Sequence, residues 1–110
     1  MTDIARKLKA AGYTGPDPTA SIDMAVRMVN EVLPGWFWRV ATCCVSDDAW
    51  VGPDYNDPAH RERLLREFPQ IGIEEWTDIT DIDLRPPGRP ALALTLSVLK
   101  ALDEIERRAE

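Results

Sequence analysis

Apolar residues recur at helical spacing in four stretches of the chain. The longest pattern covers residues 90–108, and the next covers residues 19–33. Shorter amphipathic patterns cover residues 3–11 and 58–68. Each places apolar side chains on one side and charged side chains on the other, as in a helix that packs against a core. The pattern therefore predicts four helices.

Residues 34–53 follow a different pattern. Aromatic and β-branched residues fill this stretch, Pro-Gly and Gly-Pro bound it, and a Ser-Asp-Asp turn signal lies inside it. The pattern predicts a β-hairpin. Both faces of its first strand are largely apolar, so we expect that strand to be central, between helical layers. Replacing Trp38 in this strand by alanine is expected to destabilise the fold by about 3–5 kcal/mol.

A third strand is predicted where Thr80, Ile82 and Leu84 alternate with Asp81 and Asp83. The elements together predict an α/β (α+β) fold, a small three-layer α/β/α sandwich of about three strands with helices on both faces. We expect a single domain over residues 1–110, in which residues 1–18 form an N-terminal helix and linker and residues 19–110 form the core.

The composition adds an acidic balance to this picture. Hydrophobic residues make up 45% of the chain, the formal net charge is −6 and the pI is about 4.7. Such a charge argues against direct binding to duplex nucleic acid, which requires cations to neutralise phosphates. The sequence has no apolar run long enough for a membrane span and no apolar core of a secretory signal near residue 1. We expect a cytoplasmic protein with no membrane contact.

Cys43 and Cys44 are adjacent in the predicted hairpin, where successive side chains point to opposite faces. We therefore expect both to be reduced, buried packing residues. A zinc site would need more ligands than these two and His60, the single histidine. No cofactor is expected.

Two acidic stretches flank the predicted strands. Residues 47–57 and 74–83 are rich in carboxylates and contain no cation. If the strands are neighbours, these acids converge on one edge of the sheet, and the hypothesis is an acidic surface with aromatic anchors that binds a basic partner. The candidate residues are Asp47, Asp48, Trp50, Asp54, Tyr55, Glu74, Glu75, Trp76, Asp78 and Asp81. The alternative is that both stretches are solvated turns.

Three short segments carry a family resemblance. They are Trp36-Phe37-Trp38, Ala49-Trp50-Val51-Gly52-Pro53, and Asp83-Leu84-Arg85 followed by Pro90-Ala91-Leu92-Ala93. In these segments the chain resembles small phage and prophage proteins described as having a phage α/β/α sandwich domain, over residues of about 22 to 102. The resemblance implies a viral or prophage origin and an α/β/α layering, and it transfers no catalytic residues.

The sequence favours an interaction protein over an enzyme. It contains no GxSxG, no phosphate-binding glycine loop, no HExxH and no Cys-x-x-Cys. The enzymatic alternative is a divalent-metal site built from Asp47, Asp48, Asp54 and Asp57, with or without His60.

The leading hypothesis is a non-enzymatic phage or prophage protein that binds a host or viral protein. An inhibitor of a host defence or nucleic-acid-processing complex, as anti-CRISPR proteins are, fits this class because carboxylates can occupy a phosphate-binding groove. A virion or assembly component is the alternative. If the protein oligomerises, we expect a homodimer through the final helix, because Leu92, Leu96 and Leu99 widen its apolar surface.

Overall fold

The computed structural model describes residues 3–68 and 72–109. In chain order the elements are α1 (Asp3–Ala10), the short 3-10 helix η1 (Pro18–Ala20), α2 (Ile22–Val32), β1 (Trp36–Thr42), β2 (Asp47–Pro53), α3 (Arg61–Glu67), α4 (Ile73–Thr80), β3 (Ile82–Leu84) and α5 (Pro90–Ala109). The four predicted helices and the hairpin are therefore present.

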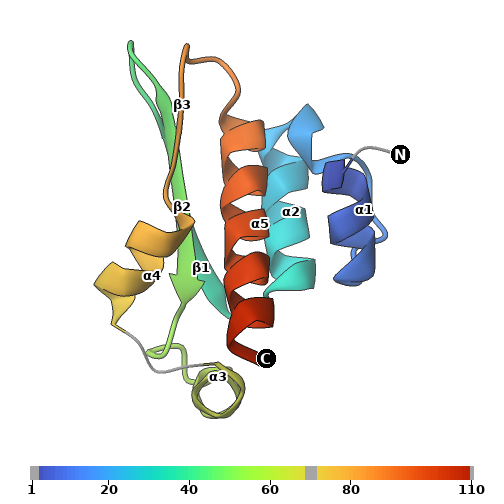
Figure 1. The fold of residues 1–110 in the computed structure, drawn as a ribbon, viewed down its shortest axis with the longest axis vertical. Coiled ribbons are helices and arrows are strands. Elements are labelled where there is room, and N and C mark those ends of the chain that lie inside the picture. Colours follow the sequence, from blue (N-terminus) through green and yellow to red (C-terminus); the bar gives the residue numbers. More distant parts are fainter. Residues whose placement is uncertain (1–2, 69–71, 110) are drawn as a thin grey trace.

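The three strands form one antiparallel sheet in the order β1-β2-β3. α5 packs against the sheet with α2 beside it, and α1 lies outside these two helices (Figure 1). α4 lies beside β2, at the edge of the sheet away from β1, and also contacts α5. The mixed α+β class and the small α/β sandwich expected from the sequence are confirmed.

α5 lies at the centre of the core. Its Ala93, Leu94, Val98 and Ala101 are fully buried, and the small alanines let the neighbouring elements approach closely. These residues share one hydrophobic cluster with residues of every layer. The cluster includes Leu8 of α1, Met28 and Val29 of α2, Trp36 of β1, Ala49 and Val51 of β2, and Trp76 of α4. One continuous core therefore joins the layers.

The expectation that the first strand is central and covered on both faces was wrong. The central strand is β2, which pairs residue for residue with β1 on one side and with β3 on the other. β1 lies at the edge, and there Trp38 is 38% exposed although Trp36 is only 5% exposed. An apolar pattern on both faces marks a buried strand only if other elements cover both faces.

Residues 73–80 form a helix that the sequence pattern did not predict. α4 ends at Thr80, so β3 is shorter than the predicted strand. The Thr80 hydroxyl accepts a hydrogen bond from the Val51 N–H (3.0 Å) and lies 2.8 Å from the carbonyl oxygens of Val51 and Trp76, to either of which it can donate. A side chain of α4 thus takes the place of a strand partner along the part of β2 that β3 does not reach.

Two other boundaries differ from the prediction. α3 begins at Arg61 and not at Pro58, although the Asp57 carboxylate does accept a hydrogen bond from the Ala59 N–H (3.1 Å). α2 begins at Ile22, and the Ser21 hydroxyl caps it by accepting from the Met24 N–H (3.2 Å). Both changes shift a helix start within one turn.

The leucines at the start of α5 are covered by the chain itself. Leu99 is buried, Leu96 packs against the core, and half-buried Leu92 faces a pocket next to α1. The helix therefore needs no second copy to cover this surface. Among residues 3–68 and 72–109, none of the helices combines the length and the apolar character needed to cross a bilayer.

Candidate functional site

Alternation along the hairpin sorts its residues onto two faces. Ala49 and Val51 lie on the face that α5 covers and are fully buried. Phe37, Arg39 and Trp50 lie on the opposite face, where Arg39 is the cross-strand partner of Trp50. We call this second surface the far face of the sheet.

The far face carries a half-buried aromatic pair. The rings of Phe37 and Trp50 meet edge to face with their centres 5.4 Å apart, and the Arg39 guanidinium lies 5.6 Å from the centre of the Trp50 ring. Gly52 makes room for this pair, because a Cβ at that position would lie 2.5 Å from the Phe37 Cζ. The far face thus holds an edge-to-face aromatic pair with a cation over the Trp50 ring.

The two acidic stretches meet beside this aromatic pair. Asp48 of β2 and Asp83 of β3 are direct cross-strand partners, and Asp81 precedes β3. The pKa of Asp81 is raised, first by burial and then by the nearby charge of Asp48, with smaller contributions from Asp83 and Asp78. We call Asp48, Asp78, Asp81 and Asp83 the acidic cluster.

Nearby cations balance the acidic cluster only in part. The Lys100 ammonium donates to the Asp81 carbonyl oxygen (2.8 Å) and opposes the rise in the pKa of Asp81. Arg85 pairs with the Asp83 carboxylate (3.2 Å), and the hydrogen bonds from Arg85 and Ser46 lower the pKa of Asp83. Among the described residues, the carboxylates of Asp48, which is beside Trp50, and of Asp78 have no hydrogen bond or ion pair.

Asp47 belongs to the fold and not to the binding surface. It is fully buried, and its carboxylate accepts hydrogen bonds from the Thr42 hydroxyl, the Gly88 N–H (2.9 Å) and the Arg89 N–H (2.6 Å). These bonds, that from Thr42 foremost, hold the pKa of Asp47 below its ordinary value. Asp47 therefore ties the hairpin to the loop before α5, which lies beside the hairpin turn in Figure 1.

The other predicted site residues are divided between the interior and the surface. Trp76 is fully buried against Trp36, with ring centres 5.0 Å apart, so it offers no surface to a partner. Burial raises the pKa of Tyr55. Asp54 follows the opposite end of β2 from Asp48, and Glu74 and Glu75 are exposed in the first turn of α4. These residues do not extend the acidic cluster.

The metal-site alternative is not supported by the geometry. Within the described residues, no three histidine, cysteine or carboxylate side chains are placed to share a metal ion. Asp47 is committed to the loop before α5, while Asp54 and Asp57 accept hydrogen bonds from the backbone N–H groups of Asn56 and Ala59. The four aspartates 47, 48, 54 and 57 thus serve separate parts of the fold.

The two cysteines are free, as expected, but the expectation that they are buried was wrong. β1 ends at Thr42, so Cys43 and Cys44 lie in the exposed hairpin turn. Hydrogen bonds from the Val45 N–H, and then from Ser46, lower the pKa of the Cys43 thiol. The turn starts earlier than the Ser-Asp-Asp signal indicated, because Asp47 and Asp48 already belong to β2.

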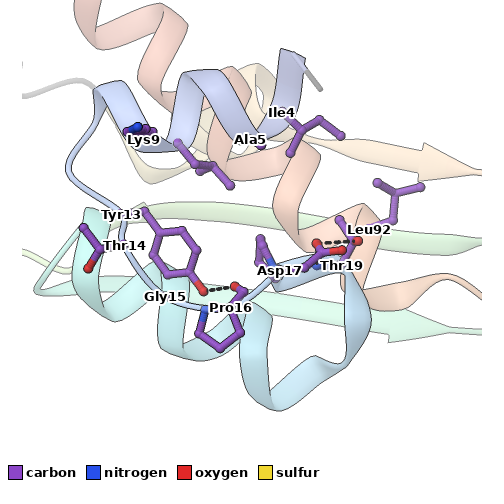
Figure 2. Close-up of a pocket in the computed structure, with 12 residues that line it drawn as sticks. Ile4, Ala5, Lys9, Tyr13, Thr14, Gly15, Pro16, Asp17, Thr19 and Leu92 are labelled. Atoms are coloured by element: carbon purple, nitrogen blue, oxygen red, sulfur yellow. Dashed lines mark hydrogen bonds between the residues drawn. The ribbon is translucent and has the colours of Figure 1, made fainter. Parts of the chain in front are cut away.

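A pocket of about 690 Å³ lies between α1, residues 13–19 and the first turn of α5 (Figure 2). Ile4, Leu8 and Leu92 contribute apolar walls. The Tyr13 hydroxyl donates to the Pro16 carbonyl oxygen, and Figure 2 shows this bond along one side of the pocket. The volume falls within the range of about 300–1,000 Å³ that is usual for small-molecule sites.

Sequence reasoning missed this pocket because it treated residues 15–18 as a linker. The Asp17 carboxylate accepts from the Thr19 N–H (2.9 Å) and the Thr19 hydroxyl (2.7 Å), so the loop is locally ordered. A Cβ at Gly15 would lie 2.7 Å from the Tyr13 hydroxyl oxygen. The glycines and prolines that surround Tyr13 were the sequence signal available for an ordered loop.

No family model, curated protein or solved structure matches this chain.

Proposed function

We propose that this protein is a non-enzymatic interaction protein that binds a basic surface of another protein through the acidic cluster and the adjoining aromatic pair of the far face. The observation that carries the proposal is the placement of Asp48 opposite Asp83 and close to Asp81. Like charges directly opposite one another in a sheet destabilise it. A cationic partner would relieve that repulsion, so the arrangement favours binding such a partner.

The aromatic pair supplies the second requirement of a binding surface. Charge accelerates the encounter of two proteins, whereas buried aromatic contacts supply most of the affinity. Trp50 is half-buried next to Asp48, and its contacts with Phe37 and Arg39 hold it in place before any partner arrives. A surface organised in advance loses less side-chain entropy on binding.

Within this class, the role we propose is inhibition of a host defence or nucleic-acid-processing complex in the host cytoplasm. A row of carboxylates resembles the charge of a nucleic-acid backbone, and such a complex presents a basic groove. The resemblance of residues 36–38, 49–53, 83–85 and 90–93 to phage proteins implies a viral or prophage origin, which supports this choice of partner.

A charge-reversal experiment tests the proposal. Tagged protein captures partners from a bacterial lysate, and the association rate of the purified partner is measured at low and high salt. Asp48→Lys/Asp81→Lys should slow association by at least about tenfold at low salt and much less at high salt. The matched control Asp23→Lys/Glu62→Lys makes the same charge change at exposed positions of α2 and α3. Equal rates for the two folded double variants would refute the acidic cluster as the binding surface.

One observation favours a second function, the binding of a small apolar molecule in the pocket of Figure 2. The walls are mainly apolar, and the carboxylate of Asp17 is already satisfied by Thr19. Titration with anilinonaphthalene sulfonate, an apolar fluorescent anion, tests this function. Binding should saturate at one site and be lost in Leu92→Trp, which fills the pocket, while persisting in Leu102→Trp on another part of α5.

A further inference from the structure

The two edges of the sheet differ in how they are protected. At the edge opposite β1, β3 pairs with β2 over Asp47–Ala49, and the Thr80 hydroxyl then bonds the backbone of Val51. β1 forms the other edge over seven residues. It contains no proline, pairs with β2 without an extra residue, and carries Arg39 as its single charge. Natural sheets usually protect an exposed edge with charges, prolines or bulges, so β1 is unusually open.

The hairpin register shows which backbone groups of β1 face outward. The Cys43 N–H donates to the Ser46 carbonyl oxygen (3.0 Å), which makes these two residues a hydrogen-bonded pair. Hydrogen-bonded and non-hydrogen-bonded pairs alternate along an antiparallel ladder. Phe37, Arg39 and Ala41 therefore turn their backbone groups toward β2, and the residues between them turn theirs outward.

Three outward-facing residues remain available for pairing. The Trp36 N–H already donates to the Leu33 carbonyl oxygen (3.1 Å). Among the residues that the structure describes, no hydrogen bond reaches the outward N–H and C=O groups of Trp38, Val40 and Thr42. Trp38 is 38% exposed and Thr42 is exposed, so this part of the edge is open to another strand.

We propose that two copies of this chain join through their β1 edges, antiparallel about a two-fold axis at Val40, so that their two sheets become one. The proposal goes beyond the proposed function and does not rest on it. The three free residues are symmetric about Val40. In this register Val40 pairs with Val40 of the second copy, and Trp38 pairs with Thr42 of the second copy. Every outward N–H then meets an outward C=O.

Two neighbouring registers are less favourable. An axis at Arg39 would place two arginines directly opposite each other, which destabilises a sheet. An axis at Trp38 would require the Trp36 N–H, which Leu33 already occupies. The axis at Val40 avoids both conflicts, because it places Arg39 opposite Ala41 of the second copy.

Charge complementarity identifies a second copy as the occupant of this edge. Ala41, Asp48 and Asp83 form one cross-strand row on the far face. Pairing about the axis at Val40 places Arg39 of one copy beside Ala41 of the other copy. Arg39 thereby extends the cross-strand row of that other copy by one residue. Adjacent strands are about 4.8 Å apart, so Arg39 and Asp48 of the two copies are about 10 Å apart at the backbone. The small side chain of Ala41 lies between them, and an arginine and an aspartate side chain can bridge that distance. Each copy thus supplies a cation to the acidic row of the other.

The first test measures the mass of the full chain by sedimentation velocity at micromolar to millimolar concentration. A reducing agent is present throughout, since the exposed Cys43 and Cys44 could otherwise link copies by disulfides. A concentration-dependent dimer is expected. A protein that remains monomeric over this whole range overturns the proposal.

The decisive test is a charge exchange between two variants. Arg39→Glu places two acids together in the symmetric dimer, and Asp48→Arg places two bases together, so each should weaken dimerisation by at least about tenfold. An equal mixture of the two variants restores opposite charges at both contacts and should dimerise again. Arg61→Glu and Asp23→Arg, which make the same charge changes on exposed surfaces of α3 and α2, should leave the parent dimer unchanged.

A backbone variant provides an independent check. Val40→Pro removes an N–H that the hairpin itself does not use, and proline is tolerated on edge strands. The folded variant, verified by circular dichroism, should be monomeric. If Val40→Pro does not fold, the charge exchange still decides the question. A dimer that survives both single charge variants, or a mixture that stays monomeric, would show that the contact lies elsewhere.

Discussion

Asp47 and Asp48 are adjacent in β2, yet their surroundings have little in common. Asp47 points to the covered face, is fully buried and accepts hydrogen bonds from Thr42, Gly88 and Arg89. Asp48 points to the far face and lies opposite Asp83. One carboxylate has its charge satisfied by the fold, and the other adds to an incompletely balanced acidic cluster. The alternation of a strand thus separates a structural acid from a candidate binding acid within two residues.

Trp36 and Trp38 make the complementary comparison, since they lie on the same face of the same strand. Trp36 is 5% exposed and meets the rings of Phe68 and Trp76 at 5.3 and 5.0 Å between ring centres. Trp38 is 38% exposed at the open edge. The face of a residue therefore does not decide its burial unless another element lies over it.

The tryptophan comparison yields the largest expected effect. Trp36→Ala should destabilise the fold by about 3–5 kcal/mol, because it removes a large side chain from the junction of β1 and α4. Trp38→Ala should cost less, about 2 kcal/mol, and not the larger loss expected for a central strand, since more than a third of its surface is already in water. Urea unfolding at a concentration where the protein is monomeric measures both. Equal losses for the two variants would contradict the comparison.

The aspartate comparison predicts the next largest effect. Asp47→Ala leaves the N–H groups of Gly88 and Arg89 without an acceptor and should lower the Tm by about 10 °C. Asp48→Ala should change the Tm by no more than about 2 °C, because it also removes a like-charge contact. Thermal unfolding followed by circular dichroism separates the two.

The stability difference between the parent protein and the neutral variant Asp47→Asn is expected to depend on pH. The pKa of Asp47 is lowered in the folded protein, so its ionised form contributes stability above the ordinary carboxyl pKa. That contribution is lost as the pH falls through the lowered value. The difference in Tm between the parent and Asp47→Asn should therefore shrink on acidification, and a difference that grows at low pH would contradict this assignment.

The protected edge of β2 predicts a smaller effect. Thr80→Val keeps the shape of the side chain but leaves the Val51 N–H unpaired, and should cost about 1–2 kcal/mol. Thr80→Ser keeps the hydroxyl and should cost less. Urea unfolding of the pair gives the difference, and hydrogen exchange of the Val51 amide should be faster in Thr80→Val. An unchanged exchange rate of the Val51 amide would mean that α4 does not protect this edge.

The smallest effect concerns Asp81. Its pKa is raised in the folded protein, so its contribution to stability is complete below the ordinary carboxyl pKa and is lost as the pH rises through the raised value. Asp81→Asn should therefore raise the Tm at neutral pH by about 2 °C and have no such effect in acid. This dependence is opposite in sign to that of Asp47, and a stabilisation that persists in acid would exclude the charge explanation.

Prediction from the sequence succeeded where a pattern was long and local. Four helices (α1, α2, α3 and α5) and the hairpin were predicted, because repeated apolar spacing indicates which side of an element meets the core. α4 was missed because Trp76 and Thr80 belong to a short, acidic segment whose helical state depends on packing against β2. Of the candidate binding residues, Asp48 and Asp78 lie near enough to Asp81 to raise its pKa. Trp76 and Asp47, chosen from the sequence pattern, are interior residues.

The sequence by itself determined the class of the fold, the hairpin and the identity of the charged and aromatic groups that the protein can present. The tertiary structure alone decided that β2 is central, that β1 is an open edge, that Asp47 is enclosed by the loop before α5, and that a pocket lies beside Tyr13. The physical reason is one of range. Side-chain alternation and helical spacing are local properties of the backbone, whereas burial depends on which distant segment lies over each face.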